Sequence, residues 1–304
     1  MIKRGQLSPG GPEVSELVFG FWRMHEDPSS HSPEKVLEKV DACLELGITT
    51  MDHAAIYGLF DNEELFGKAL AERPSVRDDI EIVTKAGIYI PCDNYPEVTG
   101  AHYNATADKL IESCERSLKM LQTDRIDLFL VHRPDWLCRA DDTAAGLEKL
   151  REQGKILHAG VSNYTPPQFD LLAAKLGRPP ATNQVEINLL TMDALYDGTL
   201  NQCEQHNVRP MAWSPLGGGR LFDADDEAAA RIRAKMDELS PKYGDAKYDA
   251  LAIAWVLAHP SRPVGILGTN KIRRIQSAAK AATIKLKHED WYALWTASKG
   301  HSIP

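Results

Sequence analysis

The strongest constraint on the fold of this chain is a regular alternation of short apolar segments with longer amphipathic ones. The short segments are rich in β-branched and aromatic residues, as buried strands are, and the longer ones repeat apolar residues at helical spacing. Eight such pairs predict a closed (β/α)8 barrel, the TIM barrel, with parallel strands rather than an open sheet. The expected strands are 16–22, 48–52, 80–87, 125–133, 156–163, 182–187, 208–215 and 262–268, and the expected helices are 32–47, 61–71, 105–121, 143–153, 166–175, 194–206, 246–258 and 271–281.

The two ends of the sequence lie outside these pairs. Residues 2–17 contain the turn-forming sequence PGG and predict a hairpin that plugs the bottom of the barrel. Residues 288–298 predict an extra C-terminal helix. With no low-complexity tract and no break in composition, we expect one domain over residues 1–304.

Composition and charge argue against several classes of protein. The net charge of −8 gives no general attraction to nucleic acid or to an anionic membrane. The first 18 residues contain no apolar signal segment, and no run of about 18 apolar residues predicts a membrane span. The cysteines lack metal-binding or C-x-x-C spacing, so we expect free thiols, no metal site and a reducing, cytoplasmic setting. They are Cys43, Cys92, Cys114, Cys138 and Cys203.

Polar side chains end most of the predicted strands. Asp52 ends the second strand, Lys85 lies near the end of the third, and His132 ends the fourth. Side chains alternate along a strand, so Thr50 shares a face with Asp52, and Leu130 shares one with His132. In a (β/α)8 barrel these strand ends form one rim, where active sites are built. The same rim is expected to hold Ser162, Asn163, Gln184, Trp213 and Ser214.

Four of the residues near this rim, taken one at a time, have structural explanations. Asp52 and Lys85 can form a structural ion pair, Tyr57 can pack in its loop, and His132 can be an ordinary core histidine. Together they suit proton transfer: a tyrosine pKa of about 10 is lowered by a nearby ammonium, which a carboxylate holds in place. An imidazole adds a hydrogen bond, and the set can protonate an oxygen that becomes an alkoxide.

Three loops that follow strands are longer than a barrel requires, namely 88–104, 133–142 and 214–245. Loops at this end of a barrel carry substrate-binding residues. We expect Trp22 and Tyr89 to form an apolar wall of the substrate pocket, beside Tyr57. Trp136 and Phe222 either contribute to that wall or pack within their own loops.

Seven segments, in order from about residue 14 to about residue 280, resemble the aldo-keto reductases. The resemblance implies an NAD(P)(H)-dependent carbonyl reductase on a (β/α)8 barrel, and the segment at 212–222 is similar to that of the bacterial YdhF-type oxidoreductase branch. The segments are TTMDHAAIYG, EIVTKAG, DLFLVHRPD, GKILHAGVSNY, TNQVEIN, MAWSPLGGGRL and GILGTNKIRRI.

The resemblance also implies a role for each residue of the rim. Tyr57 would exchange a proton with the carbonyl oxygen, Lys85 and Asp52 would tune Tyr57, and His132 would orient the carbonyl. Trp213 would stack on the nicotinamide ring. By the same match, the carboxamide would be held by Ser162, Asn163 and Gln184, and the pyrophosphate by backbone amides around Ser214, Leu216 and Gly218. No G-x-G-x-x-G motif follows the first strand, so this is not a Rossmann site.

The basic segment GTNKIRRI predicts where the adenosine end of the cofactor binds. Its cations lie at an expected helix start, which favours phosphate, so we expect NADPH rather than NADH; the alternative is a solvated basic helix face. The segment departs from the family pattern at Gly268, where a lysine is common, and at Ala278, where an adenine-contacting asparagine is common. The expected cofactor residues here are Gly268, Thr269, Asn270, Lys271 and Arg274, with Arg273 adding charge.

Three functional readings follow. The first is a cytoplasmic, monomeric, NADPH-dependent reductase whose partner is a small-molecule carbonyl: a sugar or lipid aldehyde, a dicarbonyl or a ketone. The alternative is a nicotinamide-cofactor-binding redox sensor or regulatory subunit with little turnover. A third reading keeps the barrel and makes the polar rim a structural ion-pair network.

Overall fold

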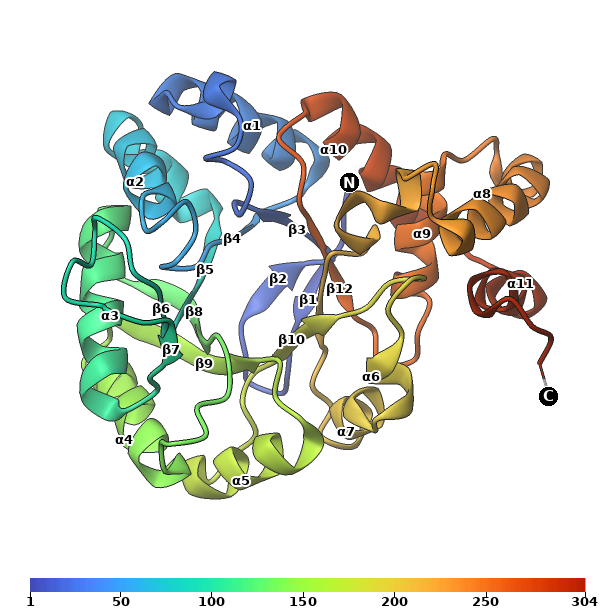
Figure 1. Ribbon diagram of the computed structural model, residues 1–304. Helices are drawn as coiled ribbons and strands as arrows, with labels where there is room; N and C mark the ends of the chain where they lie inside the picture. Colours follow the sequence, from blue (N-terminus) through green and yellow to red (C-terminus); the bar gives the residue numbers. More distant parts are fainter. Residues whose placement is uncertain (304) are drawn as a thin grey trace.

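Eight parallel strands close into a barrel in chain order, so the predicted (β/α)8 fold is confirmed (Figure 1). The computed structural model describes residues 1–303, apart from the side chain of Ser29. Each strand pairs with its neighbours in parallel register, and the last strand, β12, pairs with the first, β3, to complete the ring. The strands are β3 (Leu17–Gly20), β4 (Thr50–Asp52), β5 (Glu81–Ala86), β8 (Ile126–Val131), β9 (Ile156–Ser162), β10 (Asn183–Glu186), β11 (Met211–Trp213) and β12 (Val264–Leu267).

Most helices surround the barrel because they bury an apolar face against the outward side chains of the strands, whereas α8 and α11 lie outside this ring and pack against each other. The helices are α1 (Pro33–Leu46), α2 (Asn62–Glu72), α3 (Ala107–Leu121), α4 (Ala140–Glu152), α5 (Pro166–Leu176), α6 (Asp193–Tyr196), α7 (Thr199–Gln205), α8 (Glu227–Leu239), α9 (Tyr248–Leu257), α10 (Ile272–Ala279) and α11 (His288–Lys299). Short 3-10 helices occupy Pro28–Ser30, Pro74–Asp79, Gly217–Phe222, Ser240–Tyr243 and Lys280–Thr283.

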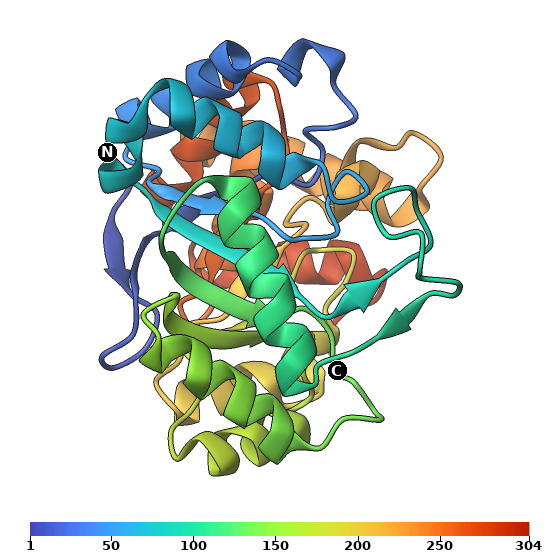
Figure 2. The ribbon, with the colours of Figure 1, turned by 90° about the vertical axis from the view of Figure 1, so that its left-hand side faces the viewer.

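The N-terminal hairpin closes one end of the barrel, as predicted. Its strands β1 (Arg4–Gln6) and β2 (Glu13–Ser15) are antiparallel, and Leu7 and Val14 pack with inward side chains of the barrel such as Leu128. Figure 2 shows this hairpin at one end and the small hairpin of β6 (Ile88–Tyr89) and β7 (His102–Tyr103) at the other. The plugged end leaves only the opposite end open for a site.

Local sequence signals explain most element boundaries. The Ser32 hydroxyl accepts a hydrogen bond from the backbone of Lys35 at 3.3 Å, and Gly47 ends α1 with a φ of 84°. The predicted helix over 194–206 is two helices, because Gly198 takes a left-handed φ of 89° between them. The expected loop 214–245 contains α8, and the expected loop 88–104 contains the whole β6–β7 hairpin.

Alternation along the strands decides which side chains reach the barrel interior. Leu128 and Leu130 pack inside the barrel, whereas Phe129 belongs to an outer cluster between strands and helices. Met51 likewise packs outside, between the inward Thr50 and Asp52. The predicted polar residues therefore reach the open end from inward-facing positions.

Candidate active site

A cavity of about 1380 Å³ opens at the carboxyl ends of the strands, and most of the predicted site residues line it. Its walls come from the loops after several strands, so residues far apart in sequence face one space. The predicted residues in its lining are Trp22, Asp52, Tyr57, His132, Ser162, Asn163, Gln184, Trp213, Ser214, Leu216, Gly218, Gly268, Thr269 and Arg274. Phe222 also lines it.

Lys85 is fully buried and connects the predicted proton-transfer residues. Its Nζ lies 2.9 and 2.8 Å from the two carboxylate oxygens of Asp52 and donates to the His53 carbonyl oxygen at 2.6 Å. It also donates to the Tyr57 hydroxyl at 3.2 Å. Carboxylate, ammonium and phenol thus form one chain, with Tyr57 and Asp52 facing the cavity.

Burial and charge set the protonation of this chain. Burial raises the pKa of Tyr57, and the Lys85 ammonium offsets only part of that rise. Lys85 lowers the pKa of Tyr57, as expected from the sequence, but burial raises it by more. The net pKa is therefore raised, and the phenol keeps its proton at neutral pH. Burial lowers the pKa of Lys85, but Asp52 and Tyr57 outweigh it and the net pKa is raised, so the amine stays charged.

His132 stands beside the phenol as a neutral imidazole. Its ring meets the Tyr57 ring edge-on, with 6.0 Å between centroids. Burial, then the charges of Lys85 and Arg133, hold its pKa well below the ordinary histidine value. A neutral imidazole can donate one hydrogen bond to a substrate oxygen without adding a charge.

The residues expected to hold a carboxamide already bond to one another. Asn163, with a left-handed φ of 58°, donates from Nδ2 to the Ser162 hydroxyl at 2.8 Å. Its Oδ1 accepts from Trp213 Nε1 at 3.1 Å. Gln184 Nε2 donates to Asp52 Oδ1 at 2.9 Å. Asn163 also donates from Nδ2 to the His132 carbonyl oxygen at 3.3 Å, so it links the indole of Trp213 to the strand end that carries His132.

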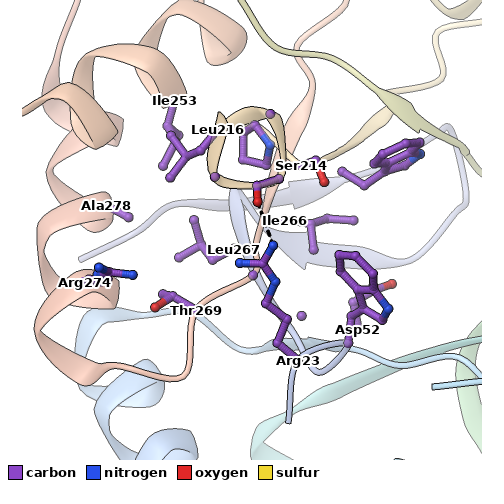
Figure 3. Close-up of a pocket in the computed structure, with 18 of the residues that line it drawn as sticks. Arg23, Asp52, Ser214, Leu216, Ile253, Ile266, Leu267, Thr269, Arg274 and Ala278 are labelled. Atoms are coloured by element: carbon purple, nitrogen blue, oxygen red, sulfur yellow. Dashed lines mark hydrogen bonds between the residues drawn. The ribbon is translucent and has the colours of Figure 1, made fainter. Parts of the chain in front are cut away.

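Three consecutive glycines border the middle of the cavity. Gly217, Gly218 and Gly219 have φ values of 61°, 66° and 106°, a left-handed conformation that side chains rarely adopt. Arg23, which follows β3 and was not predicted, donates to the Gly218 carbonyl at 2.7 Å across the cavity (Figure 3). The sequence offers one indication of this position, because Arg23 directly follows Trp22, which is expected to line the pocket.

The far end of the cavity is cationic on one side and apolar on the other. Figure 3 shows Arg274 and Ala278 on one helix, with Leu216 and Ile253 from other segments around the same space. Within residues 1–303, Arg274 has no ion-pair partner, and the same is true of Arg273, which also lines the cavity.

Two predicted cofactor residues, Asn270 and Lys271, are not in the lining of the cavity. Asn270 Nδ2 donates to the Arg23 carbonyl at 2.7 Å, so its side chain is used within the protein. Lys271 is exposed at the N-cap of α10. The cationic wall is therefore formed by Arg273 and Arg274, in the first turn of α10.

The expectation that Tyr89 lines the substrate pocket is wrong. The β6–β7 hairpin turns Tyr89 toward α3, where its hydroxyl lies 2.9 Å from the Ser113 hydroxyl and its ring stacks on His102. Ile90 lines the cavity instead. Trp136, of the loop 133–142, is 78% exposed and is not in the lining.

The residues of the cavity fit a nicotinamide dinucleotide. The indole of Trp213 lines the cavity at the end that holds Tyr57 and His132. The backbone of the three glycines allows a ligand to come close in the middle, and the guanidinium groups of Arg273 and Arg274, which have no ion-pair partner among the described residues, line the far end. This order matches an aromatic ring, a pyrophosphate and an adenosine phosphate along one extended ligand.

Comparison with known proteins agrees with this geometry. The model of the Aldo/keto reductase family matches residues 16–298. The oxidoreductase YdhF of Escherichia coli is 41% identical over all of both chains, and the 6-dehydroglucose reductase of Agrobacterium fabrum is 41% identical over 96% of both. The solved glycerol dehydrogenase of Gluconobacter oxydans superposes with a TM-score of 0.83 at 25% identity, covering 99% of this chain and 95% of the other. The chain therefore belongs to the aldo/keto reductase family and is an NAD(P)H-dependent oxidoreductase acting on small carbonyl compounds.

Proposed function

We propose that this protein uses NADPH to reduce a small aldehyde or ketone to an alcohol, with Tyr57 as the proton donor. The observation that carries the proposal is the bond of the buried Lys85 ammonium to the Tyr57 hydroxyl, 3.2 Å long, beneath a cavity that fits the cofactor. The nicotinamide cofactor, when bound, supplies hydride to the carbonyl carbon.

The side chains of the protein supply the proton that the carbonyl oxygen needs. Tyr57 is protonated at neutral pH and gives its proton to the carbonyl oxygen as negative charge develops there. Lys85, held charged by Asp52, stabilises the phenolate that remains. His132 donates a hydrogen bond that orients the carbonyl. In the oxidation direction the same phenolate takes the proton back.

NADPH is favoured over NADH because two guanidinium groups, of Arg273 and Arg274, line the far end of the cavity without protein counter-ions. Arginine pairs well with phosphate, and a 2′-phosphate is the group that NADH lacks.

We also propose that the protein acts as a monomer in the cytoplasm. All five cysteines are free, and the three most buried have raised thiol pKa values of about 12 caused by burial. Such thiols are unreactive and suit a reducing compartment. Within residues 1–303, no helix is long and apolar enough to cross a membrane.

The test is consumption of NADPH, followed by its absorbance, with a panel of carbonyl compounds. The panel includes 6-dehydroglucose, because a relative with 41% identity is named for its reduction, and small aliphatic aldehydes, ketones and dicarbonyls. Turnover of one class well above the others supports the proposal and names the substrate. Tight NADPH binding without turnover of any member contradicts it and favours the redox-sensor alternative.

A further inference from the structure

Two helix faces meet at the far end of the cavity, beyond the cationic wall. From α9, Asp249 and Ile253 line the space, four residues apart and so on one face. From α10, Arg274, Ser277 and Ala278 line it at the same helical spacing. Ser277 and Ala278 lie about one turn further along α10 than Arg274.

Asp249 is joined to the opposite helix and keeps one oxygen available. The Ser277 hydroxyl donates to Asp249 Oδ1 at 3.0 Å, and the backbone of Ala250 also donates to Oδ1. In the described part of the chain, no donor bonds to Oδ2, and no cation forms an ion pair with Asp249. The carboxylate is therefore fixed in place with acceptor capacity left over.

The surroundings of this carboxylate suit a flat aromatic base. Leu216, Ile253 and Ala278 supply apolar walls (Figure 3). Ala278 offers no hydrogen-bonding group to this space, so the polar side chains here are Asp249 of α9 and Ser277 of α10. A base in this slot needs a hydrogen-bond partner for its edge, because a buried, unpaired amino group is costly.

We propose that Asp249, held by Ser277, reads the 6-amino group of the cofactor's adenine. A carboxylate only accepts hydrogen bonds, and the amino group of adenine only donates them. Hypoxanthine has a carbonyl oxygen at that position, which a carboxylate repels. The inference rests on the proposed cofactor and makes Asp249 a determinant of base specificity.

The experiment compares equilibrium binding of NADPH with that of its hypoxanthine analogue, nicotinamide hypoxanthine dinucleotide phosphate. Binding is followed by quenching of tryptophan fluorescence, because Trp22 and Trp213 line the cavity. A charge-assisted hydrogen bond predicts that the wild type prefers NADPH by about ten- to a hundredfold. In D249N, whose amide can serve either base, the preference falls to about twofold.

Two further variants sharpen the result. D249S keeps a polar residue in the first turn of α9 and is expected to lose the preference as D249N does. D225N removes one carboxylate from an exposed position outside the cavity and is expected to keep the full preference.

The outcomes separate this inference from the function on which it rests. Failure of the wild type to bind either dinucleotide overturns the proposed function. Equal binding of the two by the wild type, or a preference that survives in both D249N and D249S, overturns the role of Asp249 and leaves the reductase proposal intact.

Discussion

Gln184 and Lys85 both donate to Asp52 Oδ1, at 2.9 Å from each donor nitrogen. Gln184 comes from β10 and Asp52 from β4, so this bond spans the barrel interior. Resemblance to the family gives Gln184 a role at the carboxamide, whereas the structure places its amide nitrogen on the proton-transfer chain. The side chain of Gln184 thus connects the expected carboxamide site to the ion pair of Asp52 and Lys85.

Replacing Gln184 with methionine should destabilise the fold. The side chain keeps its length, but the buried Asp52 carboxylate loses a donor, at a cost of about 1–3 kcal/mol. Urea unfolding at pH 7.5 measures the change. Q276M, on an exposed face of α10, is the matched control and should change little; equal stability of Q184M and wild type would contradict the importance of this bond.

The ion pair of Asp52 and Lys85 should behave as a buried pair. Either D52N or K85M leaves the other group without its main counter-charge, and breaking such a pair costs about 3–5 kcal/mol. The double variant D52N/K85M should be less destabilised than the sum of the single variants. The exposed pair of Lys35 and Glu38 is the control, because water and salt screen a surface ion pair and its loss should change stability little. Additive single effects would show that the two groups are not coupled.

His53 should make the protein sensitive to acid. Its ring stacks on Phe21 with 4.1 Å between centroids, and neither ring nitrogen has a hydrogen-bond partner among the described residues. Burial, then the charge of Lys85, holds its pKa well below the ordinary value. The unfolded state therefore binds a proton below about pH 6.5 that the folded state does not, and stability falls as pH falls.

The variant H53F removes this proton linkage. Between pH 7.5 and 5.5 it should lose about 1.4 kcal/mol less stability than the wild type, as measured by urea unfolding at both values. H288Q replaces an exposed histidine and should follow the wild type. A loss in H53F as large as that of the wild type would show that His53 is protonated in the folded state.

The sequence predicts the fold and the polar rim because both depend on local periodicity. Asp52 and His132 are placed by strand alternation alone, once the strands are recognised. The ends of α1 follow from Ser32 and Gly47, which act within one turn. The start of α8 also has a local cause in the sequence: Asp226 is its N-cap, and its carboxylate accepts a hydrogen bond from the backbone N–H of Ala229.

What the sequence does not predict depends on contacts between distant segments. Tyr89 does not line the cavity because it lies in β6, where it pairs with His102 of β7, thirteen residues further along the chain. His53 owes its lowered pKa to burial and then to the charge of Lys85, which comes from another strand of the barrel. Gln184 reaches Asp52 only because the barrel closes, which no single segment encodes.

Arg274 should contribute to cofactor choice. R274A removes an unpaired guanidinium from the cavity wall, and loss of a charge-assisted bond to phosphate should weaken NADPH binding about ten- to a hundredfold. NADH binding should change much less, because it has no 2′-phosphate. K271A is the control, since Lys271 does not line the cavity, and should alter neither. Equal loss of both cofactors in R274A would contradict a 2′-phosphate site.

The most direct test of the central claim separates binding from proton transfer in Y57F. This variant keeps the ring and removes the hydroxyl that Lys85 contacts. NADPH affinity, from tryptophan fluorescence, should stay close to that of the wild type, whereas turnover of the best carbonyl substrate should fall about 10²–10⁴-fold. Y103F, on the exposed β7 strand, should retain full turnover. Turnover in Y57F equal to that of the wild type, with cofactor bound, would contradict the account of Tyr57 as the proton donor.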